Sequence, residues 1–227
     1  MKIRIFIQAL IYSPLSLWIN FRHLPVCQAI KLPIIVGGGK RIRITGKIII
    51  DAEVRPGMIL LGFGGLPFYE RKNLKIILEG TICFKGNCSI GNSCTISVPK
   101  DGKLVFGNNF KVTAGLRLAC HKYIEFGENT LVGWGCTFID SDMHALKNDS
   151  GKLPGRASII IGNNNWICQG STILKGSRTP DYTVVAACTV LAKDFSNNES
   201  RTIIAGNPAR VVKRGVWHDA YDDIIDS

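Results

Sequence analysis

The cysteines of this sequence lack the spacings that indicate a metal or redox site. Eight are present and none forms a CxxC pair, so the motifs of zinc binding and thiol exchange are missing. Zinc-finger spacing and the aromatic-glycine signature of RNA-binding domains are missing too, which argues against a nucleic-acid partner. We predict free cysteines, as expected for a protein of the reducing cytosol, and no bound metal.

A long apolar run is also lacking. The uncharged run at residues 5–21 is at the lower limit for a membrane-spanning helix, and Gln8, Pro14 and Asn20 weaken it further. The small-residue cleavage site of a signal peptide does not follow it. We predict a short helix that packs on the rest of the chain or lies at a membrane surface, with a spanning helix as the weaker alternative.

Acidic residues are scarce relative to basic ones. The chain of 227 residues has 17 Asp and Glu against 28 Lys and Arg, which gives a net charge of +11. This balance favours an anionic partner, such as a phosphate-rich cofactor, an acidic glycan or a membrane surface, although solubility alone could explain it. The length favours a single domain.

A six-residue repeat is present between Ile161 and Ser196. One phase is mostly large and aliphatic: Ile161, Ile167, Ile173, Thr179, Val185 and Leu191. Four places further on, the residues are mostly small and polar: Asn165, Ser171, Ser177, Thr183, Thr189 and Phe195. An α-helix cannot keep a period of six on one face, and the segment is several times longer than an ordinary strand. The repeat therefore predicts a parallel β-helix made of hexapeptides.

The same phase can be followed toward the N-terminus. Its inward positions are Phe84, Ile90, Ile96, Phe106, Val112, Leu118, Phe126, Val132 and Phe138. Cysteines occupy the small position at Cys88, Cys94 and Cys136, where a free thiol packs as a small apolar group. Three hexapeptides make one turn of eighteen residues, so the segment 84–196 supplies about five turns.

The breaks in this phase divide the chain. We predict an apolar, basic helical segment and linker at 1–39, the β-helix at 40–213 and a C-terminal helical cap at 214–227. Residues 60–72, rich in glycine, are expected to form a loop. A second loop at 145–160 leaves the coil beside His144, and excursions of this length are commonly functional.

Four motifs carry a family likeness. They are Asn165-Trp166-Ile167, Ile173-Leu174-Lys175-Gly176, Val185-Ala186-Ala187 and Ala205-Gly206-Asn207-Pro208-Ala209-Arg210. In this order they resemble the left-handed β-helix acyltransferases, in the branch of galactoside, maltose and polysaccharide O-acetyltransferases. The likeness is strong over 126–213 and weak before residue 84. It implies a left-handed coil, acetyl-CoA as co-substrate, and a bacterial homotrimer with active sites in the clefts between neighbouring coils.

Acetyl transfer to a hydroxyl needs a general base, and histidine titrates near neutral pH. His144 is the candidate, because the family's catalytic histidine falls just before the loop. An aspartate could hold its tautomer; Asp142 is preferred, with Asp140 as the alternative. His121 competes with His144, but its position in the repeat differs, and we expect it at the surface or lining a cleft.

The resemblance also supplies a path for the cofactor. The residues that match it are Trp166, Cys168, Gln169 and Ala187 along the pantetheine arm, Ala192 and Lys193 beyond it, and Lys193, Arg210 and Lys213 near the nucleotide and its phosphates. Cationic side chains suit that anionic group. Two residues depart from the family pattern, since Cys168 replaces a usual glycine and Ala192 a frequent threonine.

The prediction is an acetyl-CoA-dependent O-acetyltransferase acting on a sugar hydroxyl in surface polysaccharide biosynthesis (capsule, O-antigen or exopolysaccharide). Three alternatives stay open: an N-acyltransferase on an amino sugar, a non-catalytic β-helix scaffold, and a γ-type carbonic anhydrase, which would need three histidines around zinc. We expect a cytoplasmic protein, with peripheral contact to the inner face of the cell membrane through its N-terminal segment.

Overall fold

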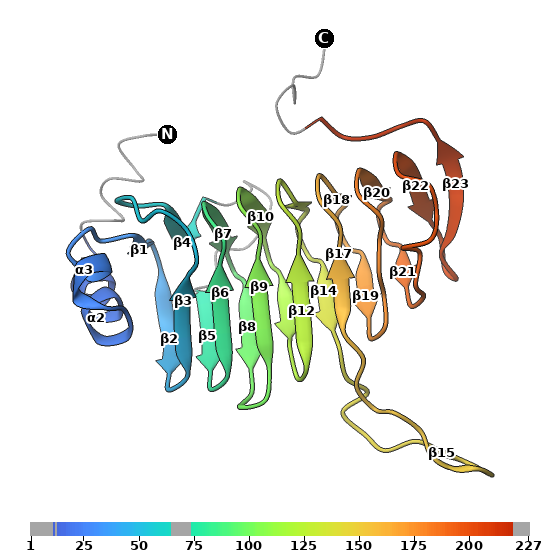
Figure 1. Cartoon of the computed structure of the whole chain (residues 1–227), viewed down its shortest axis with the longest axis horizontal. Coiled ribbons are helices and arrows are strands. Elements are labelled where there is room, and N and C mark those ends of the chain that lie inside the picture. Colours follow the sequence, from blue (N-terminus) through green and yellow to red (C-terminus); the bar gives the residue numbers. More distant parts are fainter. Residues whose placement is uncertain (1–10, 12, 65–73, 220–227) are drawn as a thin grey trace.

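The computed structural model describes residue 11 and residues 13–64 and 74–219, which fold into short strands preceded by two short helices (Figure 1). The strands form three long sheets, which we call A, B and C. Sheet A contains β1 (Ile34–Val36), β4 (Ile59–Phe63), β7 (Cys88–Asn92), β10 (Phe110–Ala114), β13 (Leu131–Val132), β18 (Trp166–Ile167), β20 (Thr183–Val185), β22 (Thr202–Ala205) and β23 (Arg210–Arg214). Sheet B contains β2 (Gly39–Ile44), β5 (Leu74–Leu78), β8 (Thr95–Val98), β11 (Arg117–Ala119), β14 (Thr137–Ile139), β19 (Thr172–Leu174) and β21 (Val190–Leu191). Sheet C contains β3 (Lys47–Ile50), β6 (Thr81–Phe84), β9 (Lys103–Phe106), β12 (Tyr123–Phe126) and β17 (Ile159–Ile161).

From β1 to β19 the chain visits sheets A, B and C in rotation, so each of these turns adds one strand to each sheet (Figure 1). Beyond β17, the side of sheet C continues only as isolated bridges of Arg178 with Ile160 and Asp194. Neighbouring strands within a sheet are parallel, except that β23 runs antiparallel to β22. The turns therefore stack on one another around a shared interior, and each buries its inward side chains against the next turn.

The six-residue phase is confirmed by the register of the strands. Phe84 pairs with Phe106, Phe106 with Phe126, and Phe126 with Ile161 in sheet C. The three phenylalanines are buried and stack, with 5.6 Å between successive ring centroids. Burying an aromatic or large aliphatic side chain stabilises a fold by about 1.5–3 kcal/mol, so this interior column is a main source of stability.

Small residues are required where turns approach closely. Gly91, which the repeat places in its glycine position, has such a role: a Cβ atom there would lie 1.9 Å from the carbonyl oxygen of Thr113 on the next turn. The cysteines at the small positions are buried, as predicted, and burial raises the pKa of Cys94 to about 12 and that of Cys136 to about 11.

The helix α2 (Ser13–His23) packs against the first strand of sheet A, which confirms one of the two predicted placements of the N-terminal helix. The buried amide of Asn20 donates to the carbonyl of Ile34 at 2.7 Å and accepts from its N–H at 3.2 Å, and Ser16 Oγ accepts from the N–H of Val36 at 2.9 Å. These side chains hydrogen-bond the backbone groups of β1, which is the edge strand of sheet A and would otherwise expose them unpaired.

Three segments differ from the prediction. The segment 23–39, predicted as a linker, contains α3 (Val26–Ala29) and β1, because Asn20 and Ser16 give β1 partners at its edge. The predicted loop at 60–72 begins inside β4, and residues 65–73 lie outside the described part. The predicted loop at 145–160 ends earlier, because β17 already pairs with β12 at residue 159.

The C-terminal helix predicted within 214–227 is not seen in the residues that the structure describes there. Residue 214 ends β23, and residues 216–219 form no helix; residues 220–227 lie outside the described part. Among the described residues, no helix is both long and apolar enough to cross a membrane.

Candidate active site

An excursion of the chain leaves the coil between β14 and β17 (Figure 1). Its base is an antiparallel bridge between Ser141 and Arg156, beside which the N–H of Asp142 donates to the carbonyl of Gly155 at 2.8 Å. A small hairpin of β15 (Lys147–Asn148) and β16 (Gly151–Lys152) follows. The bridge fixes the two ends of the excursion on the coil, and His144 comes three residues after it.

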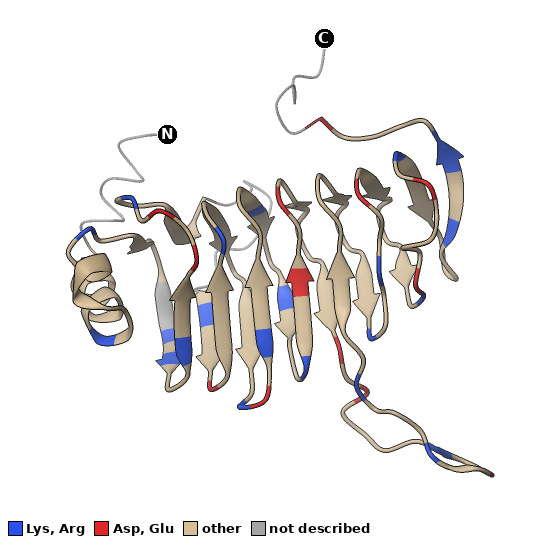
Figure 2. Ribbon diagram, viewed as in Figure 1, with Lys and Arg blue, Asp and Glu red and all other residues tan. Residues whose placement is uncertain are grey.

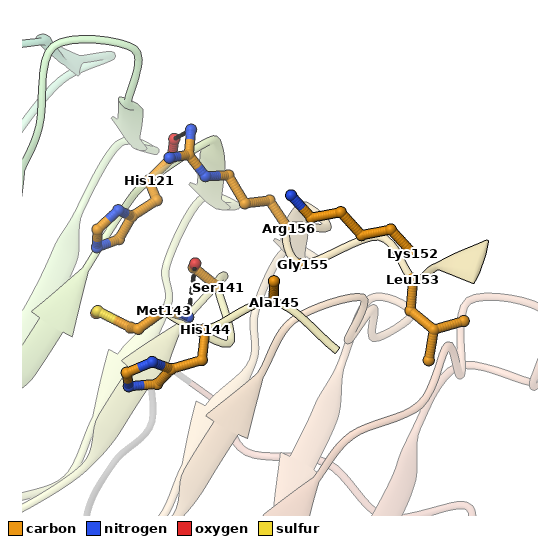
Figure 3. A pocket seen from close by; sticks show the side chains of 9 residues that line it. All are labelled: His121, Ser141, Met143, His144, Ala145, Lys152, Leu153, Gly155 and Arg156. Atoms are coloured by element: carbon orange, nitrogen blue, oxygen red, sulfur yellow. Dashed lines mark hydrogen bonds between the residues drawn. The ribbon is translucent and has the colours of Figure 1, made fainter. Parts of the chain in front are cut away.

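Two histidines face one cleft at this base. The cleft has a volume of about 530 Å³, and it is lined by His121, Ser141, Met143, His144, Ala145, Lys152, Leu153, Gly155 and Arg156. Figure 3 shows both imidazole rings directed to the same side, His144 from the excursion and His121 from the turn between β11 and β12. The cleft-lining position of His121 is therefore confirmed, and the excursion brings His144 beside it despite their different positions in the repeat.

Asp140 holds the turn that carries His121. Its buried carboxylate accepts hydrogen bonds from the N–H groups of His121, Lys122 and Tyr123 at 2.6, 2.7 and 2.8 Å. Three donors satisfy most of the capacity of a buried carboxylate and fix the turn rigidly. In the described structure, this aspartate therefore positions His121 rather than the ring of His144.

Asp142 makes an ion pair with Lys175, with 2.6 Å between Nζ and Oδ2, in a geometry that is not a well-aligned hydrogen bond. Lys175 follows β19 on the next turn, and it also donates to the carbonyl of Pro154 at 2.7 Å. One ammonium group thus joins the outgoing and returning ends of the excursion. The sequence had assigned Lys175 only to a motif, without a role.

Two residues predicted for the cofactor path, Trp166 and Lys213, lie in one row on sheet A. Trp166 pairs with Val184, Val184 with Ile203, and Ile203 with Lys213. Partners in register point to the same face, and strands are about 4.8 Å apart, so Trp166 and Lys213 lie about 14 Å apart. Arg210 lies at the other end of β23, opposite Ala205, and both cations are exposed.

Cys168, Gln169 and Ala187 lie in the turns that follow sheet A. The N–H of Cys188 donates to the carbonyl of Gln169 at 3.0 Å, so these turns stack on each other. Ala187 is exposed and Gln169 is half-buried. Cys168 is buried, and burial raises the pKa of its thiol to about 11. Its side chain is therefore a neutral packing group at neutral pH.

Ala192 and Lys193 lie at a different corner of the coil. They follow β21, at the carboxyl end of the strands of sheet B, and both are exposed. His144 follows β14, so it too lies at the carboxyl ends of these strands, two strands away from β21 in the sheet. Gln169 and Ala187 precede the strands of sheet B. Within one chain, the candidate base thus lies at the carboxyl ends of the sheet B strands, and the main part of the predicted path lies at their amino ends.

The described C-terminal residues return over sheet A. The rings of His218 and Trp166 have centroids 5.3 Å apart, and the guanidinium of Arg201 lies 4.6 Å from the ring centroid of Trp217. A ligand that reaches Trp166 therefore meets this segment as well. Its path could not be read from the sequence, because Trp217 and His218 belong to no repeat.

No metal site is formed by the described residues, since none of their His, Cys, Asp and Glu side chains gather in a group of three or more that could hold an ion. The chemistry available at the cleft is proton transfer by imidazole and hydrogen bonding by cationic side chains.

No protein-family model matches the chain. A putative lipopolysaccharide biosynthesis O-acetyl transferase, WbbJ of Escherichia coli (strain K12), is 24% identical over 146 residues, which cover 60% of this chain and 73% of that protein. An uncharacterized 24.8 kDa protein of the cps region of Klebsiella pneumoniae is 31% identical over 138 residues, 61% of this chain; the chain spans 60% of that relative.

Among solved structures, the polySia specific acetyltransferase NeuO has a similar fold, with a TM-score of 0.61, 19% identity and 83% of each chain covered. The repeat and the three parallel sheets are those expected of a parallel β-helix built from hexapeptides, and the fold of NeuO is similar. The chain is similar in sequence to a putative O-acetyl transferase and similar in fold to an acetyltransferase.

Proposed function

We propose that the chain transfers an acetyl group from acetyl-CoA to a sugar hydroxyl during surface polysaccharide biosynthesis. The observation that carries the proposal is the position of His144, held beside a cleft by a bridge and an ion pair at the base of the excursion. The names of WbbJ and NeuO, and the cps region of the Klebsiella relative, support the polysaccharide context.

His144 would act as the general base. Its imidazole takes the proton of the acceptor hydroxyl as the oxygen attacks the acetyl carbonyl, and the imidazolium then gives the proton to the leaving sulfur. Acetyl-CoA supplies an activated thioester when bound. The accessible residues of the turns near Gln169 and the exposed cations Arg210 and Lys213 suit a long anionic co-substrate. Asp142 would act indirectly, by fixing the segment that carries His144.

We also propose a left-handed coil and a homotrimer. In one chain, the candidate general base His144 and the main part of the predicted cofactor path lie at opposite ends of the sheet B strands. A neighbouring copy that brings its own path against the cleft of His144 would complete the site, as the resemblance implies. This arrangement would also place Lys193 near the interface between the two copies, because Lys193 lies at the same ends of the sheet B strands as His144.

The proposed location is the cytoplasmic side of the cell membrane, with the N-terminal end of the coil in contact with anionic lipid. Residues 1–50 contain eight Lys and Arg and no Asp or Glu. Large apolar side chains are exposed at this end: Leu17, Trp18, Phe21, Val26 and Ile30. Figure 2 shows basic residues on α2, β2 and β3 beside them. Apolar groups with adjacent cations are the features of an interfacial anchor.

Two alternatives carry separate consequences. An N-acyltransferase would acetylate the amine of an amino sugar, and a scaffold would bind no CoA. Incubating the protein with acetyl-CoA and paired hydroxyl and amino sugars, with released thiol as the readout, distinguishes them. His144→Ala should abolish transfer while the protein keeps its trimeric mass in sedimentation. Full activity in that variant would end the proposed mechanism.

A further inference from the structure

We infer that the cleft of His144 selects a sugar acceptor that carries an anionic group, a carboxylate or a phosphate, and that Arg156 binds this group. The inference rests on the proposed O-acetyl transfer and names its acceptor class. It is carried by the charges that line the cleft. Of the nine lining residues, Arg156 and Lys152 are cationic, His121 and His144 are imidazoles, and none is acidic.

Nearby carboxylates do not neutralise these cations. The carboxylate of Asp140 accepts hydrogen bonds from three backbone N–H groups, and the carboxylate of Asp142 is paired with Lys175. The carboxylate of Asp101 lies 3.9 Å from Arg156 Nη1, and its side chain is 81% exposed. Such an exposed pair at the limit of contact contributes little. An anionic ligand would therefore meet a net positive cleft.

The backbone of Arg156 is held in place at the base of the excursion. Its backbone forms the bridge to Ser141, and its Nη1 donates to the carbonyl of His121 at 3.5 Å. Figure 3 shows the side chain reaching from the excursion toward His121, above the two imidazole rings. Among the described residues, the Nε and Nη2 donors have no partner. A guanidinium with donors left over can form the paired hydrogen bonds that carboxylates and phosphates accept.

The geometry gives the acceptor two points of attachment. Its anionic group would bind Arg156 on the His121 side of the cleft, and its hydroxyl would face His144. Lys152 lines the same cleft from β16 and would add a point charge without fixed direction. Holding both ends of a sugar orients the hydroxyl for proton transfer, which is where such binding raises the rate.

The test uses the full-length protein, acetyl-CoA and sugars in matched pairs. The pairs are methyl glucoside with methyl glucuronide, methyl galactoside with methyl galacturonide, methyl glucoside with its 6-phosphate, and the methyl glycoside of N-acetylneuraminic acid with its methyl ester. Thiol release and product mass give kcat/KM for each. We expect an acidic member to exceed its neutral counterpart at least about tenfold, the gain typical of a charge-assisted hydrogen bond. The uronide and phosphate arms identify which anion is preferred.

Arg156→Gln should remove this preference, lowering kcat/KM on the acidic sugar about tenfold or more and leaving the neutral sugar within about twofold. Arg156→Lys should keep part of it. Lys147→Gln is the matched control, since Lys147 is an exposed cation of the same excursion outside the cleft lining. Equal use of acidic and neutral sugars, or equal slowing of both by Arg156→Gln, would overturn the inference and leave O-acetyl transfer standing. Acetylation of no sugar at all would overturn both.

Discussion

Lys175 holds Asp142 across the base of the excursion that carries His144, with 2.6 Å between Nζ and Oδ2. The two residues come from different turns of the coil, and His144 is two residues from Asp142. The same ammonium group donates to the carbonyl of Pro154 on the returning end of the excursion. The position of the candidate base therefore depends on a lysine of the next turn.

Lys175→Met should reduce kcat about 10- to 100-fold, because a shift of about 1 Å in a catalytic group can cost that much. Affinity for CoA should change less than kcat, since Lys175 is not among the residues of the predicted cofactor path. Steady-state kinetics with calorimetric CoA binding checks both. The contact is partly exposed, so the free energy of unfolding should fall by no more than about 1 kcal/mol.

Lys147→Met is the control for the Lys175 variant, because Lys147 is exposed on the same excursion. It should leave kcat unchanged, and Lys175→Arg should recover much of the activity. Wild-type kcat in Lys175→Met would show that the ion pair does not position His144.

Asp140→Asn should destabilise the protein by about 2–4 kcal/mol. The amide keeps one acceptor oxygen and turns a donor toward the N–H groups of residues 121–123, which leaves backbone donors beside a buried side chain unsatisfied. Urea unfolding of the variant measures the loss. Asp101→Asn, at an exposed aspartate, should cost less than about 0.5 kcal/mol. Equal stability of Asp140→Asn and the wild type would contradict the assigned role.

Thiol labelling of the native protein should modify Cys27 and Cys188 first, since these two are exposed and the other six are buried. Burial also raises the pKa of Cys168 to about 11, so its thiolate is scarce at neutral pH. Labelling with mass spectrometry gives the rate at each cysteine.

CoA should protect Cys188 from the reagent, because its N–H bonds to Gln169 on the predicted cofactor path. Cys27, in α3 at the far end of the coil, is the internal control and should label at the same rate with and without CoA. Protection of neither cysteine at saturating CoA would place the co-substrate elsewhere.

Vesicles of phosphatidylglycerol should sediment the protein, and vesicles of phosphatidylcholine should do so weakly. Replacing Trp18 and Phe21 together by Ser should reduce binding about tenfold or more, because each contributes exposed apolar area beside Arg22. Val212→Ser, at an exposed valine on β23, is the control. Equal binding to both lipids, or none, would refute the proposed membrane contact.

From Phe84 onward, the inward positions of this protein were predictable from the sequence. A period of six fixes which side chains point inward, and the pairing of Phe84, Phe106, Phe126 and Ile161 follows it turn after turn. The first turn was harder to predict. Its strands β1 and β4 lie outside the readable phase, and β1 is held by Asn20 and Ser16 of a helix, which a local pattern cannot reveal.

The candidate site was likewise predictable only in part from the sequence. The sequence identified His144 as the candidate base and placed it at the point where the repeat breaks, because an inserted loop interrupts a strict period. Only the tertiary structure decided what surrounds it: His121 across the cleft, Arg156 beside them, and Lys175 on Asp142. The pairs His121 with His144, Asp142 with Lys175 and His121 with Arg156 are 23 to 35 positions apart in the sequence. The distance between such residues depends on how the excursion folds back, which no periodicity determines.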